Sequence, residues 1–261
     1  MVAASPAGVH VVSRLNVAVY VSVLGALTAS TAQAQGVDEF GAYGTSEHHW
    51  ESSQDFALEF RLGPYRPRID DEFSGATPYR DVFGTGTRLM IGTEFDWQVL
   101  DVGGIGSLGP GVGIGYTRMS ARAAFADGSG LSSEDTSLII VPLWAVAVFR
   151  VDALARQTPV PLAFYGKAGL ATGLWWVKDG DGTAVDDKGV HGKGRSDGWT
   201  IAGGLMLDLG FIDEESSRQM DVDSGINHSY LFGELVALGL GASDSMRVGA
   251  NTWLAGLAFE L

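Results

Sequence analysis

Hydrophobic and polar residues alternate with a period of two over much of the chain. In FALEFRL, residues 56–62, phenylalanine and leucine occupy every second position, with Ala57, Glu59 and Arg61 between them. This period is typical of a β-strand whose two faces meet different surroundings. Eight such stretches are predicted as strands: 56–62, 88–100, 111–117, 138–151, 161–176, 199–211, 228–240 and 252–261.

The two faces of these strands favour a membrane barrel over a soluble β-sandwich. One parity is apolar, as Ile201, Leu205 and Leu207 illustrate, and the other carries glycine, alanine and scattered charges. A water-facing surface would instead carry Lys, Thr, Gln and Glu at most positions. The interior of an eight-stranded barrel is just wide enough for side chains to fill. We therefore predict an all-β fold, a transmembrane antiparallel up-and-down β-barrel of eight strands.

The segments between the strands predict the orientation of the barrel. With the N-terminus in the periplasm, four connections face outward, and most of them are long and rich in Gly, Asp and Ser, as in external loops. The periplasmic connections are expected to be short, and the last of them is longer than this rule predicts. The expected external loops are 63–87, 119–136, 178–197 and 241–248, and the periplasmic connections are 101–110, 152–160 and 212–227.

The N-terminus has the features of a secretory signal. Arg14 precedes the apolar stretch 15–27, and Ala32-Gln33-Ala34 is a small-x-small cleavage site. An N-terminal membrane anchor is the alternative, but the stretch is shorter than the roughly 20 residues of a spanning helix. The expected domains are a signal peptide at 1–34, an N-terminal periplasmic extension at 35–53 and an outer-membrane β-barrel at 54–261.

Composition narrows the possible functions. The formal net charge is −14, so phosphate backbones are repelled and nucleic acid is not expected as a partner. The chain has no cysteine, which excludes disulfides and thiolate metal sites. The aspartates of 178–189 lack the final glutamate of an EF-hand, and His228 and Ser229 lie in no nucleophile motif. We therefore expect no metal, no cofactor and no catalytic residue.

Charged residues on the inward parity are predicted to form a network in the lumen. They fall at similar heights along their strands, so they can meet in one layer. One hypothesis is a charged plug or gate in which Arg61 and Lys167 bridge the carboxylates. The alternative, which we favour, is a network that only satisfies buried polar groups. The predicted members are Glu59, Arg61, Glu94, Asp96, Lys167, Asp208 and Glu234.

The chain resembles a known class of proteins. Its signal-like start, alternating strands and terminal aromatic strand resemble small bacterial outer-membrane β-barrels of the OmpA/OmpX type. The stretches FRLGPYRPRIDDEF and PYRDVFG are also similar to an uncharacterised outer-membrane β-barrel family. This resemblance implies the bacterial outer membrane as location, with lipid and lipopolysaccharide as surroundings.

The last strand carries the most specific part of the resemblance. It is similar to the signal that the barrel-assembly machinery recognises, with apolar or aromatic residues at alternate positions: Trp253, Leu257, Phe259 and Leu261. Leu261 departs from the pattern, because phenylalanine is usual there. The resemblance implies the assembly machinery as a partner during biogenesis.

Two classes of function remain, and the sequence does not indicate an oligomeric state. The first is a structural or interaction role, with external loops that contact partners or envelope components. Arg66, Arg68, Arg80 and Arg88 cluster in the first external loop, where they either pair with nearby acids or grip anionic lipopolysaccharide. The second is a narrow channel for ions or small solutes. A barrel-resident lipid-modifying enzyme is a distant alternative.

Overall fold

The computed structural model describes residues 56–124, 131–158, 160–180, 182–185, 189–211, 226–241 and 245–261. The predicted signal peptide, 1–34, and N-terminal extension, 35–53, lie outside the described residues. They remain predictions.

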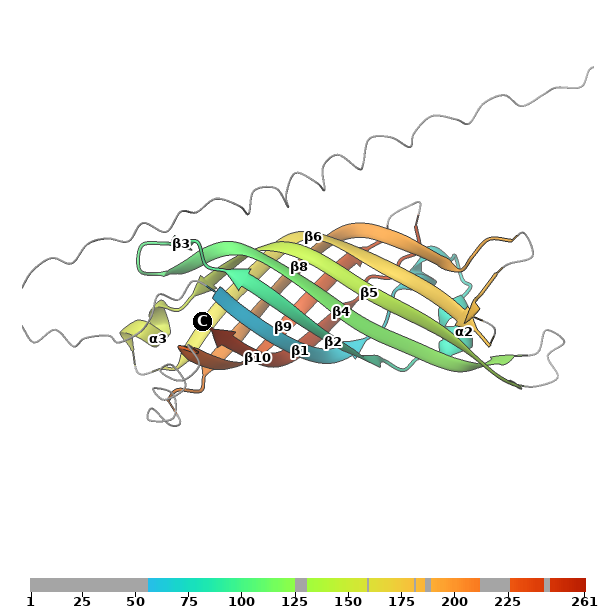
Figure 1. The fold of residues 1–261 in the computed structure, drawn as a ribbon, viewed down its shortest axis with the longest axis horizontal. Coiled ribbons are helices and arrows are strands. Elements are labelled where there is room, and N and C mark those ends of the chain that lie inside the picture. Colours follow the sequence, from blue (N-terminus) through green and yellow to red (C-terminus); the bar gives the residue numbers. More distant parts are fainter. Residues whose placement is uncertain are drawn as a thin grey trace, which may run out of the picture. The chain divides into compact units, whose positions relative to one another are not determined.

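Eight long strands form a closed antiparallel barrel (Figure 1). Each pairs with the next along the chain, and the first also pairs with the last, where Leu58 lies opposite Phe259. The predicted fold class is therefore confirmed. The strands are β1 (Phe56–Tyr65), β2 (Arg88–Trp97), β4 (Gly106–Ala124), β5 (Leu131–Val151), β6 (Leu162–Asp179), β8 (Lys193–Asp208), β9 (His228–Leu240) and β10 (Asn251–Glu260).

Short elements occupy the two ends of the barrel. At one end, here called the loop end, lie the helices η1 (Ile69–Glu72) and α2 (Pro78–Phe83) and the strand β7 (Gly182–Thr183). At the other, here called the terminal end, lie the C-terminus, β3 (Leu100–Asp101) and α3 (Ala153–Gln157). Among the described residues, none of the helices has the length and apolar character needed to cross a membrane.

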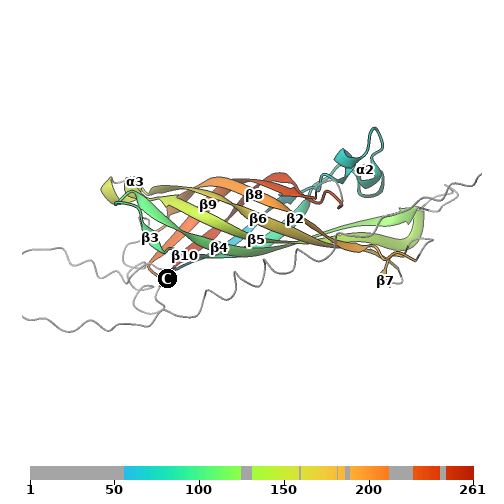
Figure 2. The same cartoon turned by 90° about the horizontal axis from the view of Figure 1, so that it is seen from above.

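The wall of the barrel is much taller on one side. The strands β4, β5, β6 and β8 have 19, 21, 18 and 16 residues, whereas β1, β2 and β10 have 10 each. About 9–11 residues suffice to cross a bilayer. Figure 2 shows these strands continuing past the body of the barrel at the loop end. The expected loops 119–136 and 178–197 are therefore wrong in extent, because much of each is strand.

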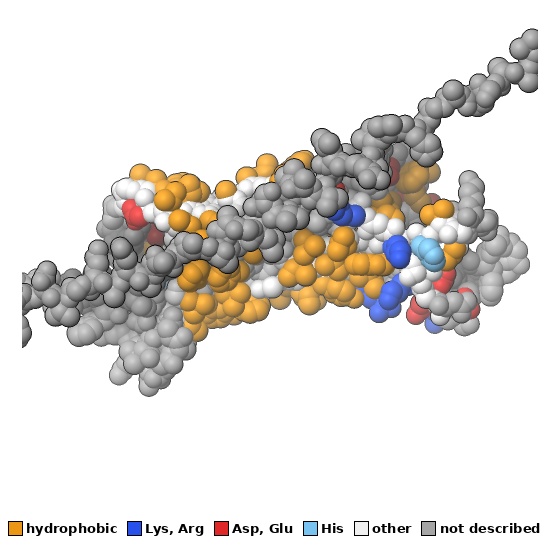
Figure 3. All heavy atoms as spheres, turned by 45° about the horizontal axis from the view of Figure 1, so that its top comes forward, with side chains coloured by type: hydrophobic (Ala, Val, Ile, Leu, Met, Phe, Trp, Pro, Cys, Tyr) orange, Lys and Arg blue, Asp and Glu red, His pale blue; other side chains and the backbone are white. Residues whose placement is uncertain are grey.

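The outward parity of the strands forms an apolar belt. Leu89 and Ile91 on β2 are more than half exposed, and Leu235 on β9 is 73% exposed. In Figure 3, hydrophobic side chains cover the middle of the visible face, and Lys and Arg gather toward the loop end. Such a belt is unfavourable in water and matches the hydrocarbon core of a bilayer. The barrel therefore has the surface of a membrane-spanning protein.

The loop-end half of the lumen is filled by apolar side chains, here called the loop-end core. The inward parity of β5 supplies Leu138 and Ile140, and the loop containing η1 and α2 contributes Ile69 and Tyr79 from above. These residues explain why 138–151 is apolar on both parities, since one face meets lipid and the other a packed core. The other main members are Tyr65, Met90, Met119, Leu238, Leu240, Val248, Ala250 and Leu254.

Candidate functional site

Below the loop-end core, six charged side chains meet in the middle of the lumen. They come from β1, β2, β6 and β9, and each lies on the inward parity of its strand. None exposes more than 6% of its surface. We call this set the charged layer: Glu59, Arg61, Glu94, Asp96, Lys167 and Glu234.

Lys167 bridges the layer from β6. Its Nζ lies 2.7 Å from Glu59 Oε2 and donates a hydrogen bond to Glu94 Oε1. Its distance to Asp96 Oδ2 is 3.8 Å, which is an ion pair without a hydrogen bond. One ammonium therefore joins carboxylates of two strands, since Glu59 belongs to β1 and the others to β2.

Arg61 is the second bridge. Its Nη1 donates to Glu234 Oε1 at 2.8 Å, and its Nη2 contacts Glu59 and lies 3.0 Å from Glu94 Oε1. The guanidinium also lies over the ring of Trp144, 5.4 Å from its centroid. Fork-shaped pairing with several carboxylates is the geometry that suits arginine in a buried network.

Two aromatic side chains complete the hydrogen bonding of the acids. The indole Nε1 of Trp144 donates to Glu94 Oε2. The hydroxyl of Tyr165 donates to Glu234 Oε2 at 3.1 Å. Neither residue was predicted, because a donor inside an apolar strand has no signature in the pattern of charges.

Glycines on β4 make room for these groups. A Cβ on Gly113 would overlap the indole ring of Trp144, and a Cβ on Gly111 would overlap the carboxylate of Asp96. The alternation of glycine with Val112 and Ile114 therefore has a spatial reason, since the inward positions of β4 beside the charged layer have no room for a side chain.

Asp208 was predicted in this network and does not belong to it. It is the last residue of β8, where its Oδ2 lies 3.0 Å from His228 Nδ1 at the terminal end. Asp208 lies opposite Tyr230 on β9, whereas Glu234 lies opposite Gly204. The prediction failed because the strand was expected to continue to residue 211, which placed Asp208 inside it, whereas β8 ends at Asp208.

A second polar cluster at the terminal end was missed, and we call it the terminal polar layer. Arg150 forms a buried ion pair with Glu260, whose other oxygen accepts a hydrogen bond from Tyr230 at 3.0 Å. Gln98 donates to Glu260 Oε1 at 3.1 Å and accepts from Ser107 at 2.8 Å. The parity of Glu260, opposite to the lipid-facing residues of its strand, was the signal that could have revealed this layer.

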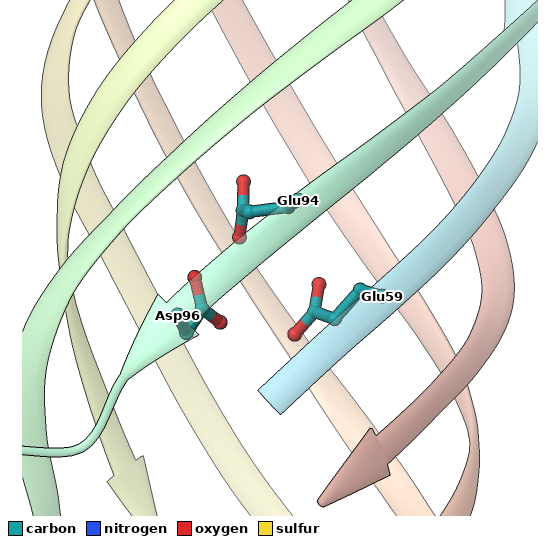
Figure 4. Close-up of side chains that lie close together, drawn as sticks. All are labelled: Glu59, Glu94 and Asp96. Atoms are coloured by element: carbon teal, nitrogen blue, oxygen red, sulfur yellow. The ribbon is translucent and has the colours of Figure 1, made fainter. Parts of the chain in front are cut away.

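The carboxylates of Glu59, Glu94 and Asp96 converge from β1 and β2 (Figure 4). An oxygen of each lies within 4.8 Å of the others, as in a metal site. However, the ammonium of Lys167 contacts all three carboxylates. The position that a cation would take is thus already held by a positive side chain.

Among the described residues, side chains leave little open space at the charged layer. A cavity of about 20 Å³ lies between Arg61, Lys167 and apolar side chains such as Leu254. That volume holds about one water molecule. The charged layer and the loop-end core together occupy much of the lumen.

At the loop end, the first external loop is ordered by its own charges. Arg66 lies 3.8 Å from Asp70, and Arg68 lies 3.5 Å from Asp71. The carboxylate of Asp70 also accepts from the main-chain N–H of Tyr79 at 2.8 Å, at the start of α2. Burial raises the pKa of the Tyr79 phenol. These contacts agree with paired charges that order the loop.

A separate set of bases lies on the outer face of the tall wall. Arg118, Ile139, Trp176 and Lys193 occupy one row across β4, β5, β6 and β8, each opposite the next. In the next row toward the loop end lies Lys178, opposite Ser137. Arg122 and Arg195 lie close by on the same outward parity. We call Arg118, Arg122, Lys178, Lys193 and Arg195 the basic rows, and all five are exposed.

The predicted assembly residues lie on the outer face of β10. Trp253 and Leu257 are 55% and 42% exposed, and Leu261 follows the end of the strand. Phe259 packs its ring edge-on against Phe60 of β1, with centroids 6.4 Å apart. The last strand therefore closes the barrel against the first, and its role as an assembly signal remains a prediction.

Neither a protein-family model nor a curated protein matches the chain. Solved structures with a similar fold include OprG of Pseudomonas aeruginosa, with a TM-score of 0.44, 10% identity, and coverage of 81% of this chain and 97% of that one. Ail of Yersinia pestis, in complex with the heparin analogue sucrose octasulfate, has a TM-score of 0.41 and 11% identity, with coverage of 79% of this chain and 97% of that one. Neisserial surface protein A has a TM-score of 0.40 and 13% identity, with coverage of 80% of this chain and 98% of that one.

These are likenesses of fold alone. The closed eight-stranded barrel and its apolar belt are those of a small outer-membrane β-barrel, so the predicted resemblance is confirmed at the level of fold. The predicted location in the bacterial outer membrane accords with the same features.

Proposed function

We propose that this chain is an interaction protein of the outer membrane, and that its basic rows bind anionic groups of envelope components such as lipopolysaccharide. The barrel serves as the anchor and the tall wall as the binding surface. Catalysis has no part in this role.

The basic rows are the observation that carries the proposal. Arg118 and Lys193 lie in one row, three strand spacings apart, which is about 14 Å at 4.8 Å per spacing. Lys178 lies one row above, between them along the wall. The row also holds Trp176, an aromatic residue of the kind that marks the edge of the apolar belt. The bases therefore stand where the headgroup region begins.

The charge of the whole chain makes this grouping informative. The net charge is −14, yet Arg118, Lys178 and Lys193 gather on one exposed surface; beside them Arg195 is paired with Asp197, and Arg122 lies opposite Asp135. Among the described residues, the side chains of Arg118, Lys178 and Lys193 have no ion-pair partner. Arginine forms bidentate hydrogen bonds with phosphate, and lysine attracts it as a point charge.

The channel alternative has less support. The charged layer is buried, and the loop-end core fills the lumen above it. A conducting pore would need both to open. The first external loop is also a weaker candidate than the wall, because Arg66 and Arg68 already pair with Asp70 and Asp71.

The test is retention of lipopolysaccharide by the folded barrel. We would reconstitute the protein in phosphatidylcholine vesicles with and without lipopolysaccharide and measure the co-purifying lipid and the unfolding temperature. The triple variant Arg118→Gln, Lys178→Gln, Lys193→Gln should lose the bound lipid and the stabilisation that it gives, while folding normally in phosphatidylcholine.

The matched control is the double variant Arg66→Gln, Arg68→Gln, which removes bases that already have acidic partners. It should retain lipopolysaccharide at the wild-type level. If the triple variant binds as much lipid as the wild type, or the control loses as much as the triple variant, the basic rows are not the binding surface.

A further inference from the structure

Asp96 is the one member of the charged layer whose carboxylate lacks hydrogen-bond donors. Both oxygens are buried, and neither has a hydrogen-bond partner among the described residues. The nearest base is Lys167, at 3.8 Å, and it already donates to Glu59 and Glu94. Gly111 leaves the space that Asp96 fills, so the side chain is packed in place.

The other three acids of the layer have hydrogen-bond donors or basic partners. Glu59 and Glu94 each contact both bases, and Glu94 also accepts from Trp144. Glu234 accepts from Arg61 and Tyr165. An ionised carboxylate is stabilised by such donors, so these three are the members suited to carry negative charge.

The charges of the layer do not balance. Four carboxylates face two bases, which leaves an excess of two negative charges, and the nearby Arg150 is paired with Glu260. A proton on one carboxylate removes one of the two. An unpaired charge in an enclosed, weakly polar interior is costly, and a carboxylate in that position neutralises by taking up a proton. We propose that Asp96 is a proton-binding site of the folded barrel and carries a proton at neutral pH.

The groups that could titrate in place of Asp96 come from six of the eight long strands. β4 presents Gly111, which carries no charge, and β8 contributes Thr200 and Ala202 at this height. The titratable and charged groups that face the layer from the remaining strands are Glu59 and Arg61 on β1, Glu94 on β2, Arg150 on β5, Tyr165 and Lys167 on β6, Tyr230 and Glu234 on β9, and Glu260 on β10.

The proton exchanges with the terminal end of the barrel. On that side lies the terminal polar layer, in which Ser107, Gln98 and Glu260 are joined by hydrogen bonds. Toward the loop end, the side chains next to the layer are mostly apolar, among them Met90, Leu238 and Leu254, and Thr200 is a polar exception. The proposal therefore predicts a site that responds to the pH on one side of the membrane.

The sign of the pH dependence follows from proton binding. The unfolded chain releases the Asp96 proton above about pH 4, whereas the folded barrel keeps it. Because the unfolded state then binds fewer protons than the folded state, stability falls as pH rises. One proton corresponds to a tenfold change in the unfolding equilibrium constant per pH unit, or about 100-fold from pH 5 to pH 7.

The experiment compares wild type, Asp96→Asn and a control at an exposed aspartate, Asp101→Asn, by urea unfolding of the reconstituted barrel between pH 5 and pH 8. The amide introduced by Asp96→Asn has the shape of the protonated acid and cannot ionise. Relative to this variant, wild type should lose stability as pH rises, and Asp101→Asn should follow wild type. Parallel curves for wild type and Asp96→Asn would overturn the proposal.

Infrared spectroscopy tests the proton directly, even where a variant fails to fold. Wild-type barrel labelled with ¹³C at the aspartate carboxyl should show, at pH 7, a carboxylic acid C=O band that shifts with the label. Absence of that band would overturn the proposal. If the band is absent and the stability of the barrel rises with added Na⁺ or Ca²⁺, a metal cation neutralises the excess negative charge in place of the proton.

Discussion

The ammonium of Lys167 lies 2.7 Å from the carboxylate of Glu59, and these residues belong to opposite walls of the barrel. In the ring of eight strands, β6 is four places from β1 in either direction. One hydrogen bond therefore spans the full bore. The charged layer joins the walls to each other and does not merely line them.

Replacement of Lys167 by methionine should strongly destabilise the barrel. It leaves Glu59 and Glu94 with one base instead of two in a buried setting, and breaking a buried ion pair by removing one partner costs about 3–5 kcal/mol. Unfolding in urea, followed by tryptophan fluorescence in detergent micelles, measures the loss.

A second substitution shows whether the stability lost in Lys167→Met comes from unpaired charge or from lost packing. Adding Glu94→Gln to Lys167→Met removes one of the orphaned charges, so the double variant should recover much of the stability. A double variant no more stable than Lys167→Met alone would mean that the loss came from packing of the lysine side chain.

The glycines of β4 and β9 provide a matched pair of variants. Gly113→Ala should displace the indole of Trp144 and cost about 1–3 kcal/mol, because the added methyl overpacks the lumen. Gly233→Ala adds the same methyl on the lipid-facing parity, where nothing lies within 4 Å, and should be nearly neutral. Thermal unfolding of both variants in one lipid measures the difference, and equal costs would contradict the inward position of Gly113.

The free-energy cost of a charged residue on the apolar belt should depend on its position along the membrane normal. Leu235→Arg, at the 73% exposed position of β9, should cost about 2–4 kcal/mol in a bilayer. Ser120→Arg lies on the outward parity of β4 beside the basic rows and should cost little. Folding equilibria in phosphatidylcholine vesicles measure both, and similar penalties would mean that the belt has been placed at the wrong height.

The closed lumen predicts the absence of conductance. Wild type should pass no measurable current in planar bilayers, and Lys167→Met should also stay closed, because Ile140, Leu240 and Leu254 still fill the loop-end half. Open-channel steps from wild type would favour the channel function. Steps from Lys167→Met alone would identify the charged layer as the gate.

Alternation was enough to predict the eight strands and the faces of most of them. Lipid outside and packed side chains inside are different surroundings, so Phe60 and Leu62 separate cleanly from Glu59 and Arg61. The same logic failed in 138–151, where lipid on one face and the loop-end core on the other both select apolar residues. Arg150 was overlooked inside that run although it is almost fully buried.

The members of the charged layer were predicted by parity, but their partners were not. Parity places Glu94 and Lys167 inside the barrel, yet the stagger of the strands decides which heights coincide. Asp208 was wrongly included because β8 ends there and not at residue 211. The role of Trp144 depends on the empty space at Gly113, which is a relationship across two strands that no single stretch of sequence displays.

Pairing of β1 with β10 also constrains the order in which the protein can fold. Because these strands come from opposite ends of the described sequence, the sheet keeps two open edges until the last strand arrives. Such distant pairings form slowly, and open edges template unwanted association with other chains. Synthesis and closure are thus separated in time, and both edges of the sheet stay unpaired during the interval between them.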